Sequence, residues 1–194
     1  MTLSLAAIQR RLVHYYGLDE VPAIDGFVRV SDDVEREQLL VRWGEDGVEM
    51  ALELPRQAAT GRDLDAICQL VEGVSHFVFV AERARSELPL TQLELELQAE
   101  VDKYVVLAVT SEPPLDAVSR AALHERLFGA VRFVHPPDTE HGERYRIAHR
   151  LAMRFTQKLD HRYLRHGRHH ELRAALCRFY RAGQTTKLEL ARAA

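Results

Sequence analysis

The spacing of apolar residues predicts that the chain begins with a helix. In residues 3–16 apolar side chains recur at intervals of three and four, which places them on one helical face. These residues are Leu5, Ile8, Leu12 and Tyr15. Thr2 or Ser4 can cap the start of the helix, and Gly17 can end it.

The next segment predicts a small sheet. Three apolar runs follow that are short enough for strands: residues 27–30, 39–43 and 48–54. The third run alternates apolar and polar residues, as in a strand with one covered face. Asp46 and Gly47 precede it, and an Asp-Gly pair favours a tight hairpin turn. We therefore predict a three-stranded antiparallel meander, with Trp43 and Met50 packed under the first helix.

Two longer segments, residues 63–87 and 90–108, fit both a helix and strands. Each has apolar residues at steps of three and four, which is typical of a helix. Against this, residues 76–80 (HFVFV) have the composition of a strand, and Gly73 weakens a helix by roughly 1 kcal/mol relative to Ala. The content of Glu, Gln, Ala and Leu in the second segment favours helix. We predict an antiparallel helical hairpin here.

The remaining sequence predicts further helices. Helical stripes extend over residues 115–128 and 144–164, and another basic helix ends before Gly183, followed by a short terminal helix. Residues 130–134 are expected to form a short strand, and residues 135–142 (HPPDTEHG) an exposed loop.

These elements predict a helix-rich α+β fold, with an N-terminal helix and a three-stranded antiparallel meander followed by a helical bundle. We expect residues 1–60 to form a helix-plus-meander subdomain. Residues 61–194 form the helical region with basic C-terminal helices, and the two parts are expected to make one compact unit. No internal repeat is present in the sequence.

Composition places the chain among ordinary globular proteins. It has 194 residues, of which 46% are hydrophobic and 28% charged, and this excludes disordered and collagen-like classes. Cys68 and Cys177 are too few for a disulfide framework or a four-thiolate zinc site, which favours a reducing compartment. No signal-peptide pattern begins the chain, and no apolar run approaches the roughly 20 residues of a membrane span. We predict a cytoplasmic protein without membrane insertion.

Charge is distributed unevenly along the chain. Residues 1–100 carry 9 basic and 19 acidic side chains, whereas residues 101–194 carry 17 basic and 10 acidic ones. The basic residues of one predicted helix recur every three or four positions, so they line one face. That stripe comprises Arg150, Arg154, Lys158, Arg162 and Arg165, and Arg168 can extend it. It suits a phosphate backbone or an acidic protein surface, but it is equally a solvated face neutralised by the acidic half.

A second candidate site combines a histidine with carboxylates. Glu72 and His76 are four residues apart and share a helical face, and the predicted hairpin places His76 opposite Glu100. Glu96 and Glu100 repeat the same spacing on the partner helix. This composition is found in metal and acid–base sites between helices, so Glu72, His76 and Glu100 are the candidate catalytic residues. The alternatives are a hydrogen-bonded structural histidine and a solvated acidic face.

Other chemistry has little support in the sequence. The four histidines at positions 161, 166, 169 and 170 match no zinc-ligand spacing, and the surrounding arginines disfavour a bound cation. Gly-rich phosphate loops, the G-x-S-x-G elbow and the H-E-x-x-H motif are absent from the sequence. We therefore expect no metal and no cofactor.

The function that these observations favour is that of an interaction or adaptor protein. It would bind a protein partner through its basic C-terminal helices. Two alternatives stay open: binding of nucleic acid through the same basic face, and an enzyme with the His/carboxylate site between helices.

Overall fold

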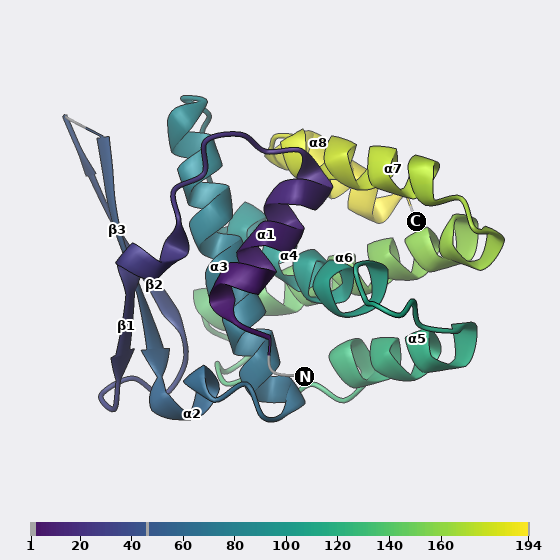
Figure 1. The fold of residues 1–194 in the computed structure, drawn as a ribbon, viewed down its shortest axis with the longest axis horizontal. Coiled ribbons are helices and arrows are strands. Elements are labelled where there is room, and N and C mark those ends of the chain that lie inside the picture. The colour runs from purple at the N-terminus through teal and green to yellow at the C-terminus, as the bar shows by residue number, and fades with distance from the viewer. Residues whose placement is uncertain (1–2, 46, 194) are drawn as a thin grey trace. The chain divides into compact units, whose positions relative to one another are not determined.

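The computed structural model describes residues 3–45 and 47–193, and over these it contains eight α-helices and one three-stranded sheet. This confirms the helix-rich α+β class. The chain divides into two compact units, Met1–Pro89 and Leu90–Ala194 (Figure 1). The N-terminal helix and the sheet belong to the first unit, and the basic C-terminal helices belong to the second. Thr2, a predicted cap, and Asp46 of the predicted turn lie outside the described residues.

Helix α1 (Leu5–Tyr16) forms as its apolar spacing predicts. The Ser4 hydroxyl accepts a hydrogen bond from the backbone N–H of Ala7 at 3.2 Å and caps the helix start. Gly17 ends the helix in the left-handed conformation at φ 61°, which glycine adopts without steric cost. The buried face of α1 includes Ile8 and Leu12.

The sheet is mixed, so the predicted antiparallel meander is wrong in one pairing. Strands β1 (Val28–Ser31), β2 (Gln38–Gly44) and β3 (Gly47–Pro55) lie in the order β1-β3-β2. The β2–β3 hairpin is antiparallel as expected, but β1 pairs with β3 in parallel. The physical reason is that β3 is the longest strand and buries Leu52 and Leu54, so it takes the centre and leaves the more exposed strands at the edges.

The prediction that Trp43 packs under the first helix is also wrong. Trp43 lies near the end of β2 and is 57% exposed, and Met50 is half-buried. Leu52 and Leu54, further along β3, provide the buried contacts instead. In the first unit α3 packs against α1 and against strands β2 and β3 of the sheet (Figure 1).

Helix α3 (Leu64–Arg85) confirms the helical interpretation of residues 63–87. The Asp63 carboxylate caps it by accepting from the N–H of Ala66 at 2.8 Å. The strand-like run 76–80 lies within the helix and is buried along its whole length. A helix covered on several faces is apolar all round, which explains why these β-branched and aromatic residues obscured its period.

Helix α3 is also long and apolar enough to cross a membrane by length and composition alone. In the structure 72% of its most apolar stretch is buried inside the protein, as in the core helices of soluble proteins. Cytoplasmic localisation stays a prediction.

Gly73 faces the sheet at a position where α3 packs tightly against Leu52 of β3. A Cβ atom at this position would lie 2.7 Å from Cδ1 of Leu52, a side chain with no exposed surface. We expect Gly73→Ala to destabilise the protein by about 1 kcal/mol, because overpacking at about 1–3 kcal/mol outweighs the better helix propensity of Ala. Urea unfolding measures the change. Gly26→Ala is the control, since nothing lies within 4 Å of its added methyl group, and a stabilised Gly73→Ala variant would contradict the close approach.

The second unit is helical in every regular element that the structure describes. Its α-helices are α4 (Gln92–Tyr104), α5 (Ala117–His124), α6 (Glu140–Arg162), α7 (His169–Arg181) and α8 (Gln184–Arg192). A π-helical turn extends α4 as η2 (Val105–Val109), another extends α5 as η3 (Glu125–Gly129), and a 3-10 turn, η4 (Leu164–His166), follows α6. The first unit adds the short helix α2 (Arg56–Ala59) and the 3-10 turn η1 (Ile24–Phe27). Helix α6 packs against α4 and α8, and its Phe155 ring stacks on Phe179 of α7 with centroids 4.2 Å apart.

Two predictions for the second unit are corrected. Residues 130–134 form no strand, because no other strand of this unit is available among the described residues to pair with them. The loop predicted for residues 135–142 ends early, since α6 already begins at Glu140. The Thr139 hydroxyl caps the helix by accepting from the N–H of Gly142 at 3.0 Å.

Candidate functional site: a basic cleft in the second unit

The second unit contains a cleft with a volume of about 620 Å³. Its walls come from the end of α4, from α5 and from the C-terminal half of α6 with the turn that follows. Five lining side chains are basic: Arg120, Arg154, Lys158, Arg162 and Arg165. Two are acidic, Glu125 and Asp160, so the cleft carries an excess of positive charge. Tyr104, His124 and His161 also line it.

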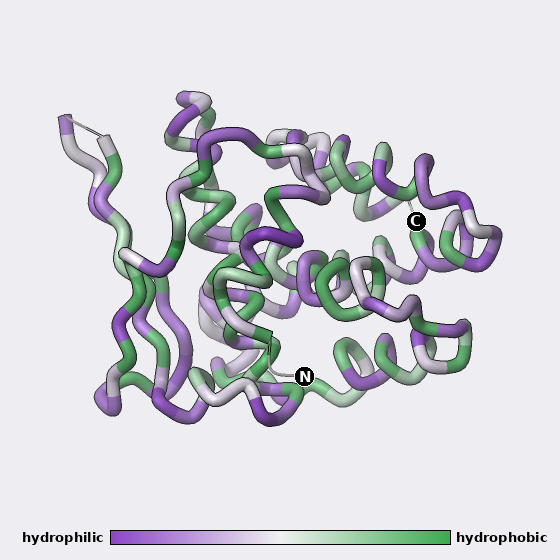
Figure 2. The backbone as a smooth tube through the Cα atoms, in the orientation of Figure 1, coloured by the Kyte–Doolittle hydropathy of each residue, from purple (hydrophilic) through white to green (hydrophobic). Residues whose placement is uncertain are grey.

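The structure brings together four of the six basic residues that the sequence predicts as a binding face. Arg154, Lys158, Arg162 and Arg165 line the cleft. Arg150 and Arg168 are exposed and do not line it. Figure 2 shows hydrophilic residues along the connection between α6 and α7, and alternating hydrophilic and hydrophobic residues along α7. A role in partner binding stays a prediction for all six.

Asp160 organises one wall of the cleft. Its carboxylate accepts hydrogen bonds from Arg120 Nε at 2.6 Å, from Arg165 Nε at 2.9 Å and from the Tyr104 hydroxyl at 3.2 Å. Burial raises the pKa of Asp160, but the hydrogen bonds from the two arginines outweigh burial and hold the pKa below its usual value. Burial and the neighbouring Asp160 raise the pKa of Tyr104 well above its usual value. Asp160 is therefore ionised at neutral pH, and Tyr104 keeps its proton.

Arg120 is a cleft residue that the sequence pattern could not identify. It lies 40 positions before Asp160 on another helix, and it belongs to no periodic stripe of basic residues. Its Nη1 also donates to the carbonyl of Leu115 at 2.7 Å. Because both contacts are local to the cleft wall, Arg120 is held in one orientation.

The cations on α6 are less constrained. Arg154 and Arg162 are exposed, and neither makes an ion pair with any residue that the structure describes. Lys158 Nζ donates to the backbone carbonyl of Ala193 at 3.0 Å. Partial burial and the adjacent Arg162 charge lower the pKa of Lys158. These three positions provide donors that an anion could contact.

His124 forms the neutral part of the same cleft. Its Nε2 lies 3.2 Å from the carbonyl oxygen of Met153 and 3.1 Å from the hydroxyl of Thr156, and the Thr156 hydroxyl donates to the carbonyl of Ala152 at 2.8 Å. A carbonyl can only accept, so Nε2 carries the proton. Burial lowers the pKa of His124 despite the bond to Met153, so the ring is neutral at pH 7.

Glu100, a predicted catalytic residue, lies in a different cluster of the second unit. Its carboxylate accepts from Lys103 Nζ at 2.8 Å and lies 3.2 Å from His149 Nδ1. The other ring nitrogen of His149 is 3.0 Å from the carbonyl oxygen of Phe128, so both ring nitrogens face acceptors. The sequence pattern does not indicate His149, because 49 residues separate it from Glu100 and no spacing rule connects them.

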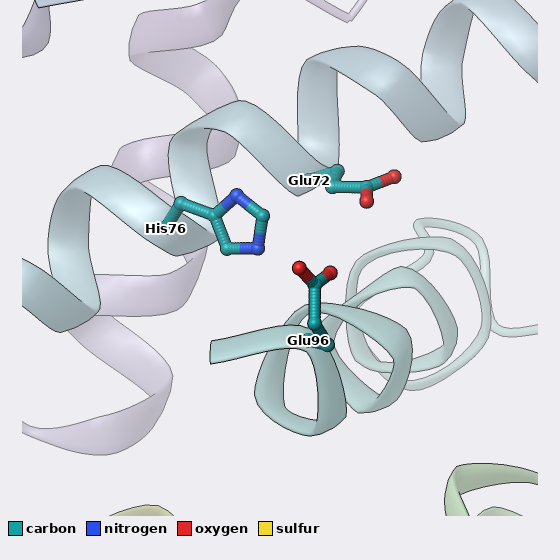
Figure 3. Close-up of side chains that lie close together, drawn as sticks. All are labelled: Glu72, His76 and Glu96. Carbon is teal, nitrogen blue, oxygen red and sulfur yellow. The ribbon is translucent and has the colours of Figure 1, made fainter. Parts of the chain in front are cut away.

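The other two predicted catalytic residues lie in the first unit. Glu72 and His76 project from the same side of α3, one turn apart, as the spacing predicts; Figure 3 also draws Glu96, which belongs to α4. Both are buried, and their nearest ligand atoms lie within 4.8 Å. Glu37, which immediately precedes β2, adds a carboxylate 4.0 Å from His76 Nδ1. No local pattern in the sequence indicates Glu37, and a catalytic role for Glu72 and His76 stays a prediction.

Fold and cleft together define a helix-rich α+β protein whose second unit carries a basic site. Comparison of the chain with protein-family models, with curated proteins and with solved structures finds no match. The chemistry of the sites themselves is therefore the basis for proposing a function.

Proposed function

We propose that the protein is an interaction protein whose second unit binds an acidic segment of a partner in the basic cleft. The observation that supports this is the charge of the cleft, which is lined by five basic side chains and two acidic ones. Asp160 already contacts Arg120 and Arg165. The positive charge available to a partner is therefore concentrated on α6, at Arg154, Lys158 and Arg162.

The spacing of these cations matches an extended peptide. They are four residues apart along α6, which corresponds to about 6 Å per step at a rise of about 1.5 Å per residue. In an extended chain, every second side chain points the same way at intervals of roughly 6.6 Å. A segment with Asp or Glu at alternate positions can therefore place a carboxylate near each of the three cations.

The aromatic content of the cleft favours a peptide over single-stranded nucleic acid. Sequence-tolerant binding of single strands uses aromatic rings that are available for stacking with bases. Tyr104 is the one Phe, Tyr or Trp side chain that lines the cleft among the described residues, and it has no exposed surface. The net charge of the whole chain is −3, which gives no general attraction to phosphate backbones.

We expect Arg154→Glu combined with Arg162→Glu to weaken binding of an acidic peptide by at least about tenfold, because charge-assisted contacts contribute about 1.5–3 kcal/mol each. The probe is a fluorescein-labelled twelve-residue peptide with Glu at alternate positions, followed by anisotropy. Both positions are exposed, so the double variant should melt like the wild-type protein when followed by circular dichroism.

The matched control carries the same charge change outside the cleft. Arg178 and Arg181 are exposed on α7 and do not line the cleft, so Arg178→Glu with Arg181→Glu should leave peptide affinity close to that of wild type. Equal losses in the cleft and control variants would contradict the proposal. If a single-stranded oligonucleotide binds more tightly than the acidic peptide, and only the cleft variant loses that binding, the cleft is assigned to nucleic acid instead.

A further inference from the structure

We propose that His124 is a binding residue of the basic cleft, and that its ring takes up one proton when an acidic ligand binds. His124 lines the cleft, and both lie within the second unit. The inference rests on the proposed function, because it concerns the ligand of the same cleft. It adds a proton site that is linked to the ligand to the fixed charges of the arginines.

The hydrogen bonds of His124 determine where an added proton goes. Nε2 lies 3.2 Å from the carbonyl oxygen of Met153, so this nitrogen carries the proton of the neutral ring. Nδ1 has no hydrogen-bond partner among the residues that the structure describes. Nδ1 therefore holds the lone pair of the neutral ring. Protonation adds an N–H donor at Nδ1 and leaves the bond from Nε2 to Met153 intact.

Two aromatic side chains pack against the ring and help to fix its orientation. The Tyr104 ring centroid lies 5.8 Å from that of His124 with an interplanar angle of 79°, and the Phe128 centroid lies 4.7 Å away at 47°. Because the pKa of Tyr104 is raised well above its usual value, Tyr104 keeps its proton and adds no charge. The ring is thus held by packing and by the bond to Met153, with one nitrogen left for a ligand.

Charged groups reach His124 from several neighbouring elements. Burial has the largest influence and lowers the pKa of the ring below its usual value. The negative charges of Asp160 on α6 and Glu125 on η3 favour the protonated ring, whereas His149 on α6 disfavours it. Burial outweighs the two carboxylates, so the ring of the unliganded cleft is neutral at pH 7.

The basic side chains of the cleft also disfavour a charge on His124 until an anion is present. Arg120 and Arg165 donate to Asp160, which offsets part of the negative charge of this carboxylate. The three cations of α6 leave the cleft with an excess of positive charge. A bound acidic ligand offsets that excess and so favours protonation of the ring. By linkage, the protonated ring binds the ligand more tightly to the same extent.

The affinity of the cleft should therefore rise as the pH falls through the lowered pKa of His124. The probe must keep its own charge, so we use a labelled peptide with cysteic acid at alternate positions, whose sulfonates stay ionised. Anisotropy should show binding about fivefold or more tighter at pH 5.5 than at pH 8. Calorimetry in two buffers with different ionisation enthalpies should detect proton uptake on binding.

Two variants assign the proton. His124→Gln keeps a donor for the carbonyl of Met153 but cannot take up a proton, so its affinity should match wild type at pH 8 and fall below wild type at pH 5.5. His166 is exposed on η4 and does not line the cleft, so His166→Gln should behave as wild type. His161 does line the cleft. If His161→Gln abolishes the change with pH and His124→Gln retains it, the proposal is overturned.

Heteronuclear NMR of the wild-type protein decides the question even if His124→Gln does not fold. The spectra should show the proton of His124 on Nε2 at pH 7, and sodium sulfate, used as a simple anion, should raise the pKa of the ring. A proton on Nδ1 at pH 7, or a titration that sulfate does not shift, would contradict this inference. Failure of the peptide to bind at pH 8 would instead contradict the proposed function, so the two failures are distinguishable.

Discussion

Replacing Glu100 by Gln is expected to destabilise the second unit by about 3 kcal/mol at pH 6. Burial raises the pKa of Glu100, but the Lys103 charge and the hydrogen bond with His149 outweigh burial and lower the pKa from 4.5 to about 2. A shift of that size corresponds to about 3 kcal/mol of stabilisation in the ionised state. Glutamine keeps the shape but removes the negative charge that both cations contact.

The same cluster predicts a characteristic dependence of stability on pH. Because folding lowers the pKa of Glu100, its contribution is present above about pH 4.5 and is lost as the pH falls towards 2. Burial lowers the pKa of His149, but the contacts with Glu100 outweigh burial and raise it above 6.5. The His149 contribution is therefore complete below pH 6.5 and is lost as the pH rises through the raised value. The difference between wild type and Glu100→Gln should be largest between these limits.

Urea unfolding followed by circular dichroism at pH 3, 6 and 9 measures this difference. Glu143→Gln is the control, since Glu143 is exposed on α6 and its loss should change the free energy of unfolding by less than about 0.5 kcal/mol. A Glu100→Gln variant as stable as wild type at pH 6 would show that the carboxylate contributes no net stabilisation.

Replacing Asp160 by Asn should cost about 2–3 kcal/mol, because Arg120, Arg165 and Tyr104 all donate to this carboxylate. Asn has a single acceptor oxygen and no charge, so it cannot satisfy the three donors. Folding lowers the pKa of Asp160, so its carboxylate stabilises the native state above about pH 4, and this stabilisation is lost as the pH falls through the lowered pKa. The free energy of unfolding of Asp160→Asn should lack this contribution at every pH.

The two arginines beside Asp160 allow an internal comparison. The Arg120 side chain is 11% exposed and the Arg165 side chain is 54% exposed. Exposed ion pairs contribute little, whereas breaking a buried pair is strongly destabilising. We therefore expect Arg120→Ala to lower the free energy of unfolding by about 1 kcal/mol or more beyond the change caused by Arg165→Ala. Urea unfolding of both variants measures the difference. Asp138 is an exposed aspartate, so Asp138→Asn is the control for Asp160→Asn. Equal effects of Arg120→Ala and Arg165→Ala would contradict the burial argument.

Local signals in the sequence were enough to predict most of the helices. Ser4, Gly17 and Asp63 act through neighbouring backbone groups, and the stripes of α1, α3 and α6 reflect the helical period. The order of the strands is a different kind of property. It depends on which strand buries more apolar surface, and this led to the incorrect antiparallel meander and the incorrect placement of Trp43.

The sites were predictable to the extent that they lie on one helix. Arg154, Lys158 and Arg162 follow from the period of α6, and the pairing of Glu72 with His76 follows from that of α3. Arg120, His149 and Glu37 could not be found in this way. Each reaches its site through tertiary packing across 39 to 49 residues, and no local pattern in a single sequence encodes such a contact.

The exposure of Trp43 has a consequence for optical spectroscopy. It is the one tryptophan in the chain, and it lies on the first unit with 57% of its surface in contact with solvent. Its emission in the native protein should already be red-shifted and open to quenching by iodide, and unfolding should move the emission maximum little. Intrinsic fluorescence is thus a poor reporter of folding for this protein, but it is a useful marker of ligands that approach the β2–β3 hairpin.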